Sequence, residues 1–144
     1  MPGLNLGLPT EAQWEYACRG GTLTPFSFGR TMSTGQVNFD GNYPYVGAEK
    51  GEYRATTVPV KALPCNDWGL YQMHGNVYEW RRDWYGDYDL ENLVDPEGPD
   101  TGVNRVLRGG SLNSVAWGLR SAYRYRGWRS NRFNDIGFRL AQGH

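Results

Sequence analysis

Glycine or proline recurs every few residues between Gly20 and Gly51, and this spacing limits the regular structure that the chain can form. No helical or strand period survives from Gly21 to Asn66. The interruptions are Pro25, Gly29, Gly35, Gly41, Pro44, Gly47 and Gly51. The same stretch carries aromatic residues that a disordered tract would lack, namely Phe26, Phe28, Phe39, Tyr43, Tyr45 and Tyr53. The pattern therefore predicts a long, ordered loop.

The composition is that of one small domain with an aromatic core. A chain of 144 residues is long enough to bury about two thirds of its unfolded surface. Hydrophobic residues make up only 39%, yet the aromatics include six Trp and ten Tyr, which favours a core of a few large rings. The 15 basic and 15 acidic side chains cancel, so no global field attracts nucleic acid or an anionic membrane.

The sequence contains no run of about 18 apolar residues that could span a bilayer, and its first residues lack the features of a signal peptide. The compartment stays open between a bacterial or phage-like cytoplasm and export directed by a region outside this chain. The oligomeric state also stays open. Cys18 and Cys65 have no metal-site spacing and allow one disulfide at most; we favour two free thiols.

Local patterns predict a short helix and several strands. Thr10 and Gln13 form a T-x-x-Q capping box, and Gly20 and Gly21 supply the stop of a helix of roughly ten residues. Alternation predicts strands at 56–60, 105–108, 120–126 and 137–141. Residues 68–80 predict tight turns, and the acidic stretch 83–102 predicts a surface loop. The class expected is irregular α+β.

Six segments in a fixed order resemble one known family. They are LPTEAQWEYACRGG (8–21), NFDGNYPY (38–45), NDWGLYQMHGNVYEW (66–80), RVLRGGS (105–111), RSAYR (120–124) and GFRLA (137–141). In this order they resemble the formylglycine-generating-enzyme (sulfatase-modifying factor) family. The resemblance implies a C-type-lectin-like fold with small antiparallel sheets, two short helices and much ordered loop. We expect residues 1–144 to form a single domain of this kind, without the additional segment that usually precedes the LPTE motif.

The resemblance also identifies the positions where the enzymes carry their catalytic cysteines. Those cysteines flank a YRYR-like stretch and bind copper, and the flanking residues here are Ala122 and Gly127. Neither side chain can bind a soft metal or act as a nucleophile. Two histidines are too few for the iron site of the related sulfoxide synthases. We therefore expect no catalytic residues, no copper and no required cofactor. The alternative is a formylglycine-generating-type oxidoreductase, or a related enzyme, that uses different residues.

A calcium site is the one family metal site that the resemblance leaves in place. Its ligands would be side-chain and backbone oxygens of Gln72, Gly75, Val77 and Glu79, the hard ligands that calcium prefers. Gln72 stands where Asn or Asp is usual. The alternative is that Glu79 accepts hydrogen bonds from local backbone donors and binds no ion.

The segment 112–135 carries a second resemblance, to the variable proteins of diversity-generating retroelements. The shared features are the RGGS start, the RSA-R middle and the GFRLA end. Diversified positions in those proteins come from AAC codons altered at adenine, which cannot encode Trp or Lys. The residues here within the permitted set are Leu112, Ser114, Val115, Gly118, Tyr123, Tyr125, Gly127, Ser130, Phe133 and Asp135. Trp128 joins them as an exposed candidate contact.

This second resemblance implies a non-catalytic protein that displays a diversified surface to a protein or other macromolecular ligand. Tyr and Ser on a rigid scaffold have the physics of an antibody paratope. The hypothesis requires Tyr123, Tyr125 and Phe133 to face solvent in one patch. An undiversified structural or ligand-binding member would instead bury these rings, with the arginines of strand 120–126 paired to the acidic loop at Asp87, Asp89, Asp95 and Glu97. Arginine beside aromatics also suits nucleic acid, but the neutral charge argues against that partner.

Overall fold

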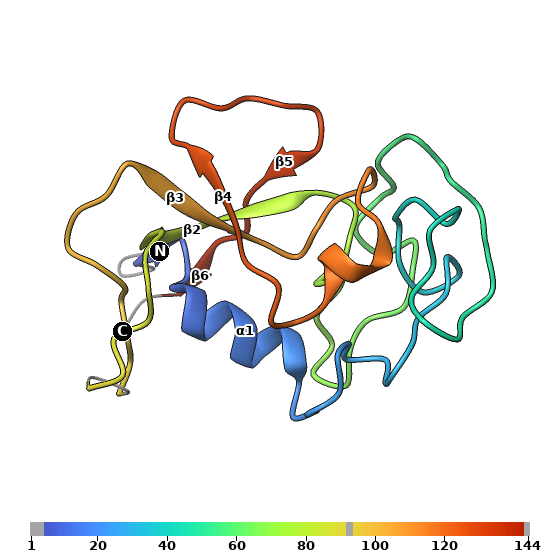
Figure 1. Ribbon diagram of the computed structural model, residues 1–144, viewed down its shortest axis with the longest axis horizontal. Helices are drawn as coiled ribbons and strands as arrows, with labels where there is room; N and C mark the ends of the chain where they lie inside the picture. The colour runs from blue at the N-terminus through green and yellow to red at the C-terminus, as the bar shows by residue number, and fades with distance from the viewer. Residues whose placement is uncertain (1–4, 92–93, 143–144) are drawn as a thin grey trace.

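Two small sheets and one α-helix form the regular part of the molecule (Figure 1). The computed structural model describes residues 5–91 and 94–142. The elements are β1 (Leu6–Gly7), α1 (Glu11–Arg19), β2 (Tyr78–Trp84), β3 (Asn104–Arg108), the 3-10 helix η1 (Ala116–Leu119), β4 (Tyr125–Trp128), β5 (Ile136–Gly137) and β6 (Ala141–Gln142). One sheet has the order β4-β3-β2-β5 and the other pairs β1 with β6. The α+β class is confirmed, although β2 and β5 are parallel and only one of the two short helices is α-helical.

The helix α1 begins and ends where the sequence predicts. Thr10 Oγ1 accepts from the backbone N–H of Gln13, and Gln13 Oε1 accepts from the N–H of Thr10, which completes the capping box. Gly20 ends the helix in the left-handed conformation, with φ of 54°. The buried face carries Trp14 and Cys18, which pack with Met73. The helix therefore lies against β2 and β3 through its apolar stripe.

Three strand predictions differ from the structure. The segment 56–60 is not a strand, because the side chain of Asn76 exchanges hydrogen bonds with Val58 and that of Asn38 donates to Thr56 O. The strand expected at 120–126 is β4, which begins only at Tyr125. The segment 137–141 divides between β5 and β6, and β2 lies in the stretch expected to form turns and loop.

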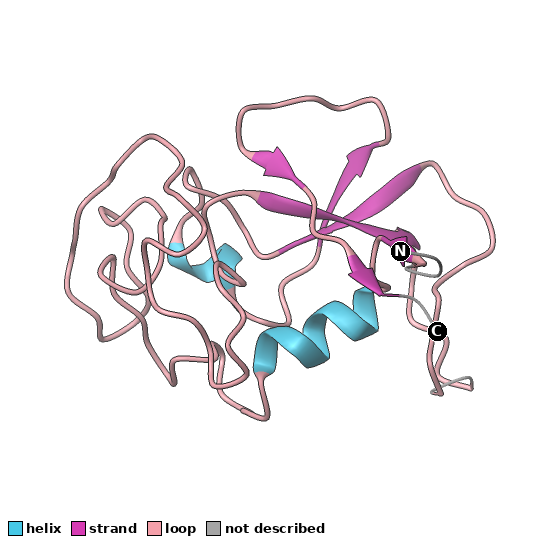
Figure 2. Cartoon of the chain, turned by 180° about the vertical axis from the view of Figure 1, so that it is seen from behind, coloured by secondary structure: helices cyan, strands magenta, loops and turns pink. Residues whose placement is uncertain are grey.

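The long loop between α1 and β2 is ordered, as predicted, and contains its own core. It fills one end of the molecule next to η1, as the view from behind shows (Figure 2). Phe26, Met32, Val37 and Phe39 pack there against Ala116 and Leu119 of η1. Cys18 and Cys65 are free thiols, as predicted, but only Cys18 is buried, because Cys65 is half-buried. Within the described ranges, no helix has the length and apolar character needed to cross a membrane.

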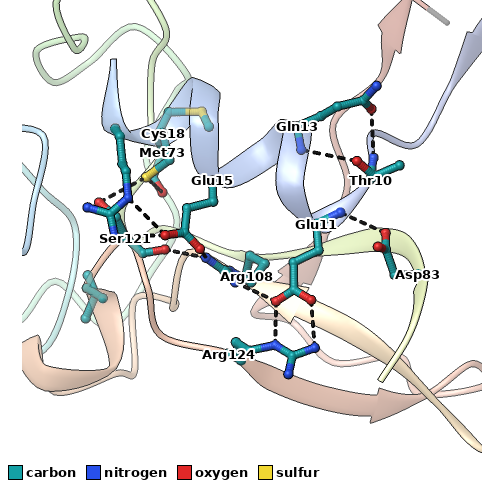
Figure 3. Close-up of polar contacts among 12 residues, drawn as sticks. Thr10, Glu11, Gln13, Glu15, Cys18, Met73, Asp83, Arg108, Ser121 and Arg124 are labelled. Carbon is teal, nitrogen blue, oxygen red and sulfur yellow. Dashed lines mark hydrogen bonds and ion pairs between the residues drawn. The ribbon is translucent and has the colours of Figure 1, made fainter. Parts of the chain in front are cut away.

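A buried network of charges joins α1 to the sheet (Figure 3). Arg108, at the end of β3, is fully buried and pairs with Glu11 and Glu15 of α1 at 2.5 Å each. Arg124 forms a bidentate pair with Glu11, with both N–O distances 2.7 Å. Arg124 therefore pairs with Glu11 and not with the acidic-loop carboxylates that the undiversified alternative names, although its Nη1 donates to the backbone carbonyl of Gly86 in that loop at 2.8 Å. The network fixes the chain on both sides of residues 109–123, the segment that leads into the candidate site.

Candidate functional site

A hollow of about 310 Å³ lies against the larger sheet, and its lining includes residues from all four strands, β4, β3, β2 and β5. Figure 1 shows the loop between β4 and β5 extending beyond the sheet, and this loop supplies part of the lining. The lining residues are Tyr78, Leu107, Ser111, Asn113, Ser114, Tyr125, Arg126, Asn131, Phe133, Asp135 and Ile136. The hollow thus combines an aromatic and aliphatic part with hydroxyl, amide and carboxylate groups, as ligand sites commonly do.

Two stacked tyrosines form the aromatic part of the hollow. Tyr78 begins β2 and Tyr125 begins β4, and their ring centroids lie 5.1 Å apart with an interplanar angle of 27°. Burial raises the pKa of Tyr78 to about 12, so its phenol stays protonated. Its hydroxyl oxygen accepts from Ser114 Oγ at 3.4 Å. Phe133, in the loop after β4, is 61% exposed and adds a third ring.

Short hydrogen-bonded turns form the polar part of the hollow. The backbone N–H of Ser111 donates to Ser114 Oγ at 3.0 Å. Asp135 Oδ2 accepts from Ser111 Oγ at 2.9 Å and from Asn113 Nδ2 at 3.3 Å. The backbone carbonyl of Asp135 accepts from the N–H of Tyr78, which connects this wall to the start of β2. The polar groups therefore have fixed positions before any ligand is present.

Four residues of the candidate variable set meet in this hollow: Ser114, Tyr125, Phe133 and Asp135. Val115, Trp128 and Ser130 are exposed outside it. Tyr123 is half-buried next to Gly118, close to the Tyr78 hydroxyl, so only two of the three expected rings line one hollow.

Leu112, Gly118 and Gly127 are buried, so the expectation that they contact a ligand is wrong. A Cβ at position 127 would lie 2.9 Å from Trp80 Cη2 and 3.0 Å from Leu107 Cδ1. Position 127 therefore accepts a larger side chain only if Trp80 or Leu107 moves. Leu112 is 2% exposed because it follows the tight Gly109-Gly110 turn into the core.

Several lining residues lie outside the set that the sequence predicted. Tyr78 and Leu107 belong to β2 and β3, and Ile136 begins β5. Their side chains meet in the hollow because of how distant strands pair, and no local sequence pattern predicts that pairing. Ser111 could have been predicted from the sequence. It ends the RGGS motif, and a serine after two glycines is typical of a turn, which here directly precedes the segment 112–135.

Among the residues proposed for calcium, Glu79 has other partners, whereas the buried side-chain amide of Gln72 has no hydrogen-bond partner in the described part of the chain. Glu79 is buried, and its carboxylate accepts from Trp14 Nε1 at 2.8 Å, from Arg81 Nη2 at 3.1 Å and from Arg139 Nη2 at 2.7 Å. Arg139 also donates to the backbone carbonyl of Gln72. Two guanidinium groups at the carboxylate do not fit a calcium ion held by Gln72, Gly75, Val77 and Glu79. The donors to Glu79 are also different from the local backbone groups of the alternative.

Comparison with known proteins agrees with this architecture. The family model described as "Sulfatase-modifying factor enzyme 1-like domain" matches residues 4–144. The chain belongs to this family. It is 35% identical to the formylglycine-generating enzyme of Bos taurus over 95% of this chain and 39% of that protein. It is 41% identical to the serine/threonine-protein kinase pkn1 of Chlamydia caviae over 94% of this chain and 21% of that protein.

A solved structure of a variable protein is also similar to this chain. Treponema denticola variable protein 1 is similar with a TM-score of 0.73 and 35% identity, over 97% of this chain and 49% of that one. The present chain thus spans less than half the length of each of these three relatives.

Proposed function

We propose that this family member is a non-catalytic ligand-binding protein whose hollow on the larger sheet receives a protein or other macromolecular ligand. The observation that carries the proposal is the convergence of Ser114, Tyr125, Phe133 and Asp135 in one hollow, although they are spread over 22 positions of the candidate variable segment 112–135. Rigid aromatic rings surrounded by small polar groups are the usual composition of a paratope. The similarity to a variable protein supports the same interpretation.

We propose that the protein is non-catalytic because of the residue types at the positions where the family's enzymes carry their catalytic cysteines. Ala122 and Gly127 stand at the positions of the enzyme cysteines, and Gly127 is buried beneath Trp80. Cys18, whose Sγ lies 3.7 Å from His74 Nε2, is also fully buried, and burial raises the pKa of its thiol to about 12. A thiol with that pKa is almost wholly protonated at neutral pH and is a poor nucleophile.

Incubation with a sulfatase-type peptide that contains the substrate cysteine is expected to leave the peptide unchanged, with or without copper. Mass spectrometry measures the loss of sulfur that accompanies formylglycine formation, and the bovine enzyme is the positive control. Conversion of the peptide would support the oxidoreductase alternative and end the non-catalytic proposal.

Binding is tested with a displayed library of random peptides. The library is first depleted on the Tyr125→Ala/Phe133→Ala double variant and then selected on the wild type. Enriched peptides are expected to bind each single variant about 30-fold more weakly, because a central aromatic anchor contributes about 2 kcal/mol or more. Isothermal calorimetry measures the affinities, and Tyr43→Ala, which removes a ring 61% exposed outside the hollow, is the matched control.

Stability measurements separate loss of contact from loss of fold. Phe133→Ala is expected to change the unfolding free energy by no more than about 0.5 kcal/mol, as an exposed position allows. Tyr125→Ala also removes the stacking on Tyr78 and is expected to cost about 1 kcal/mol. A library that shows no enrichment after depletion, or peptides that bind the variants as well as the wild type, would contradict a ligand site in the hollow.

A further inference from the structure

We propose that the hollow binds an arginine side chain of a protein partner, with Asp135 as its counter-ion. The inference rests on the proposed function and specifies the chemistry of the ligand. It is argued from the charge state of the hollow, its aromatic walls, its size and the direction of its own arginine.

Asp135 is the acidic side chain of the hollow, and it has no cationic partner in the described part of the chain. Among the described residues, its carboxylate accepts from two neutral groups, those of Ser111 and Asn113. By contrast, Glu11 and Glu79 are each paired with two arginines. A cationic donor from a ligand would add the charge-assisted hydrogen bond that the neutral donors of Ser111 and Asn113 do not supply.

The walls next to this carboxylate are suited to a planar cation. The faces of aromatic rings attract cations, and a guanidinium group also stacks on them. Tyr78 and Tyr125 are stacked on each other, and Phe133 exposes 61% of its surface. With its pKa raised to about 12 by burial, the Tyr78 phenol remains a neutral hydrogen-bonding group beside the cation.

Arg126 also borders the hollow, but its charged group lies elsewhere. Its guanidinium carbon is 5.3 Å from the ring centroid of Tyr85. Alternation along β4 places its side chain on the face opposite Tyr125. The exposed Arg129 and Arg132 of the next loop do not line the hollow. Asp135 would therefore repel an anionic ligand, with no cation of the hollow to compensate. The same carboxylate would attract a cationic ligand.

The volume of the hollow suits a single side chain of a partner rather than a larger ligand. Its 310 Å³ is at the lower end of the roughly 300–1,000 Å³ of small-molecule sites. An arginine side chain combines an apolar stem, which can contact Leu107 and Ile136, with a fork that matches a carboxylate. Arginine is also among the residues that contribute most at protein interfaces, which favours a protein as its source.

The test is an NMR titration with three capped tripeptides, in which the central residue of acetyl-Gly-X-Gly-amide is arginine, citrulline or glutamate. The arginine peptide is expected to shift the ring signals of Tyr78 and Tyr125, whereas the isosteric but neutral citrulline peptide binds at least about tenfold more weakly. The glutamate peptide is expected not to bind. Methylguanidinium, which lacks the peptide groups, is expected to bind at least about tenfold more weakly than the arginine peptide; equal binding would overturn the assignment to a protein side chain.

Variants assign the effect to Asp135. Asp135→Asn is expected to reduce affinity for the arginine peptide to that of the citrulline peptide, whereas Asp87→Asn, which removes an exposed carboxylate outside the hollow, is expected to leave it unchanged. Asp135→Glu keeps the charge and is expected to restore binding above that of Asp135→Asn. The comparison of arginine with citrulline needs only the wild type, so it stands even if a variant fails to fold.

Equal binding of arginine and citrulline, no shift with arginine up to its solubility limit, or full binding by a folded Asp135→Asn protein would each overturn the inference. Each of these outcomes leaves the proposed function standing if selected peptides still depend on Tyr125 and Phe133. Loss of that dependence ends both proposals.

Discussion

Replacement of Arg108 by methionine is expected to lower the unfolding free energy by about 3 kcal/mol, the lower end of the range for removing one partner of a buried ion pair. Arg108 is fully buried and pairs with Glu11 and Glu15, and it also donates to the carbonyl of Ser121. The lower end applies because Glu11 keeps Arg124 and Glu15 keeps Arg19 as partners. Urea denaturation monitored by tryptophan fluorescence gives the free energies.

Two further substitutions control this measurement. Arg129→Met makes the same arginine-to-methionine change at an exposed position. It is expected to lower the unfolding free energy by no more than about 0.5 kcal/mol. Arg108→Lys keeps the charge but replaces the planar fork by a single ammonium group, so it is expected to recover only part of the loss. A cost for Arg108→Met no larger than that for Arg129→Met would show that the buried network does not hold α1 to the sheet.

Local chemistry explains which elements could be predicted from the sequence. The capping box of Thr10 and Gln13 involves residues three positions apart, so the chain alone contains the whole signal. β4 depends instead on partners far along the chain. It begins at Tyr125 rather than at Arg120 because its pairing with β3 starts opposite Leu107, one residue before β3 ends at Arg108. Arg124, just before β4, instead binds Glu11, 113 residues earlier. No alternation of residue types records such a contact.

The residues of the candidate site also divide into those that local sequence predicts and those that depend on distant parts of the chain. Tyr125, Phe133 and Asp135 could be predicted because all three lie in one unusual segment. Tyr78 could not, because it enters the hollow from β2, which pairs with β5 in parallel through Ile136. Gly127 failed as a candidate for a related reason: its surroundings are set by Trp80 and Leu107 on two other strands.

His74 is expected to make the fold sensitive to acid. Its ring is buried, and burial lowers its pKa from 6.5 to about 4, an effect that the hydrogen bond of Nδ1 to the Leu119 carbonyl offsets only in part. Nδ1 donates to that carbonyl, while Nε2 accepts from the N–H of Ser27 at 3.1 Å, so the neutral ring satisfies both contacts. A proton on Nε2 would face the Ser27 amide proton and break that contact, leaving Ser27 Oγ, 3.0 Å away, as its acceptor.

The sign of this effect follows from the lowered pKa of His74. The unfolded chain takes up the proton first, so the contribution of His74 is fully present above pH 6.5 and is lost as the pH falls toward about 4. A difference of about 2.5 units corresponds to about 3 kcal/mol. Asp83 acts in the opposite direction, because burial raises its pKa from 3.8 to about 6, and its contribution is lost as the pH rises through that value.

Comparison of the wild type with His74→Asn isolates the histidine, because both proteins retain Asp83. The difference between their unfolding free energies is expected to shrink by about 3 kcal/mol between pH 7.5 and pH 4. Over this range the wild type loses the stabilising contribution of the neutral His74 ring, which the variant lacks at every pH. NMR titration of the His74 ring in the wild type gives a second measurement that needs no variant, with a midpoint expected near pH 4. A free-energy difference that does not change with pH, or a ring that titrates near 6.5, would mean that the buried contacts of His74 with Ser27 and Leu119 do not select its neutral form.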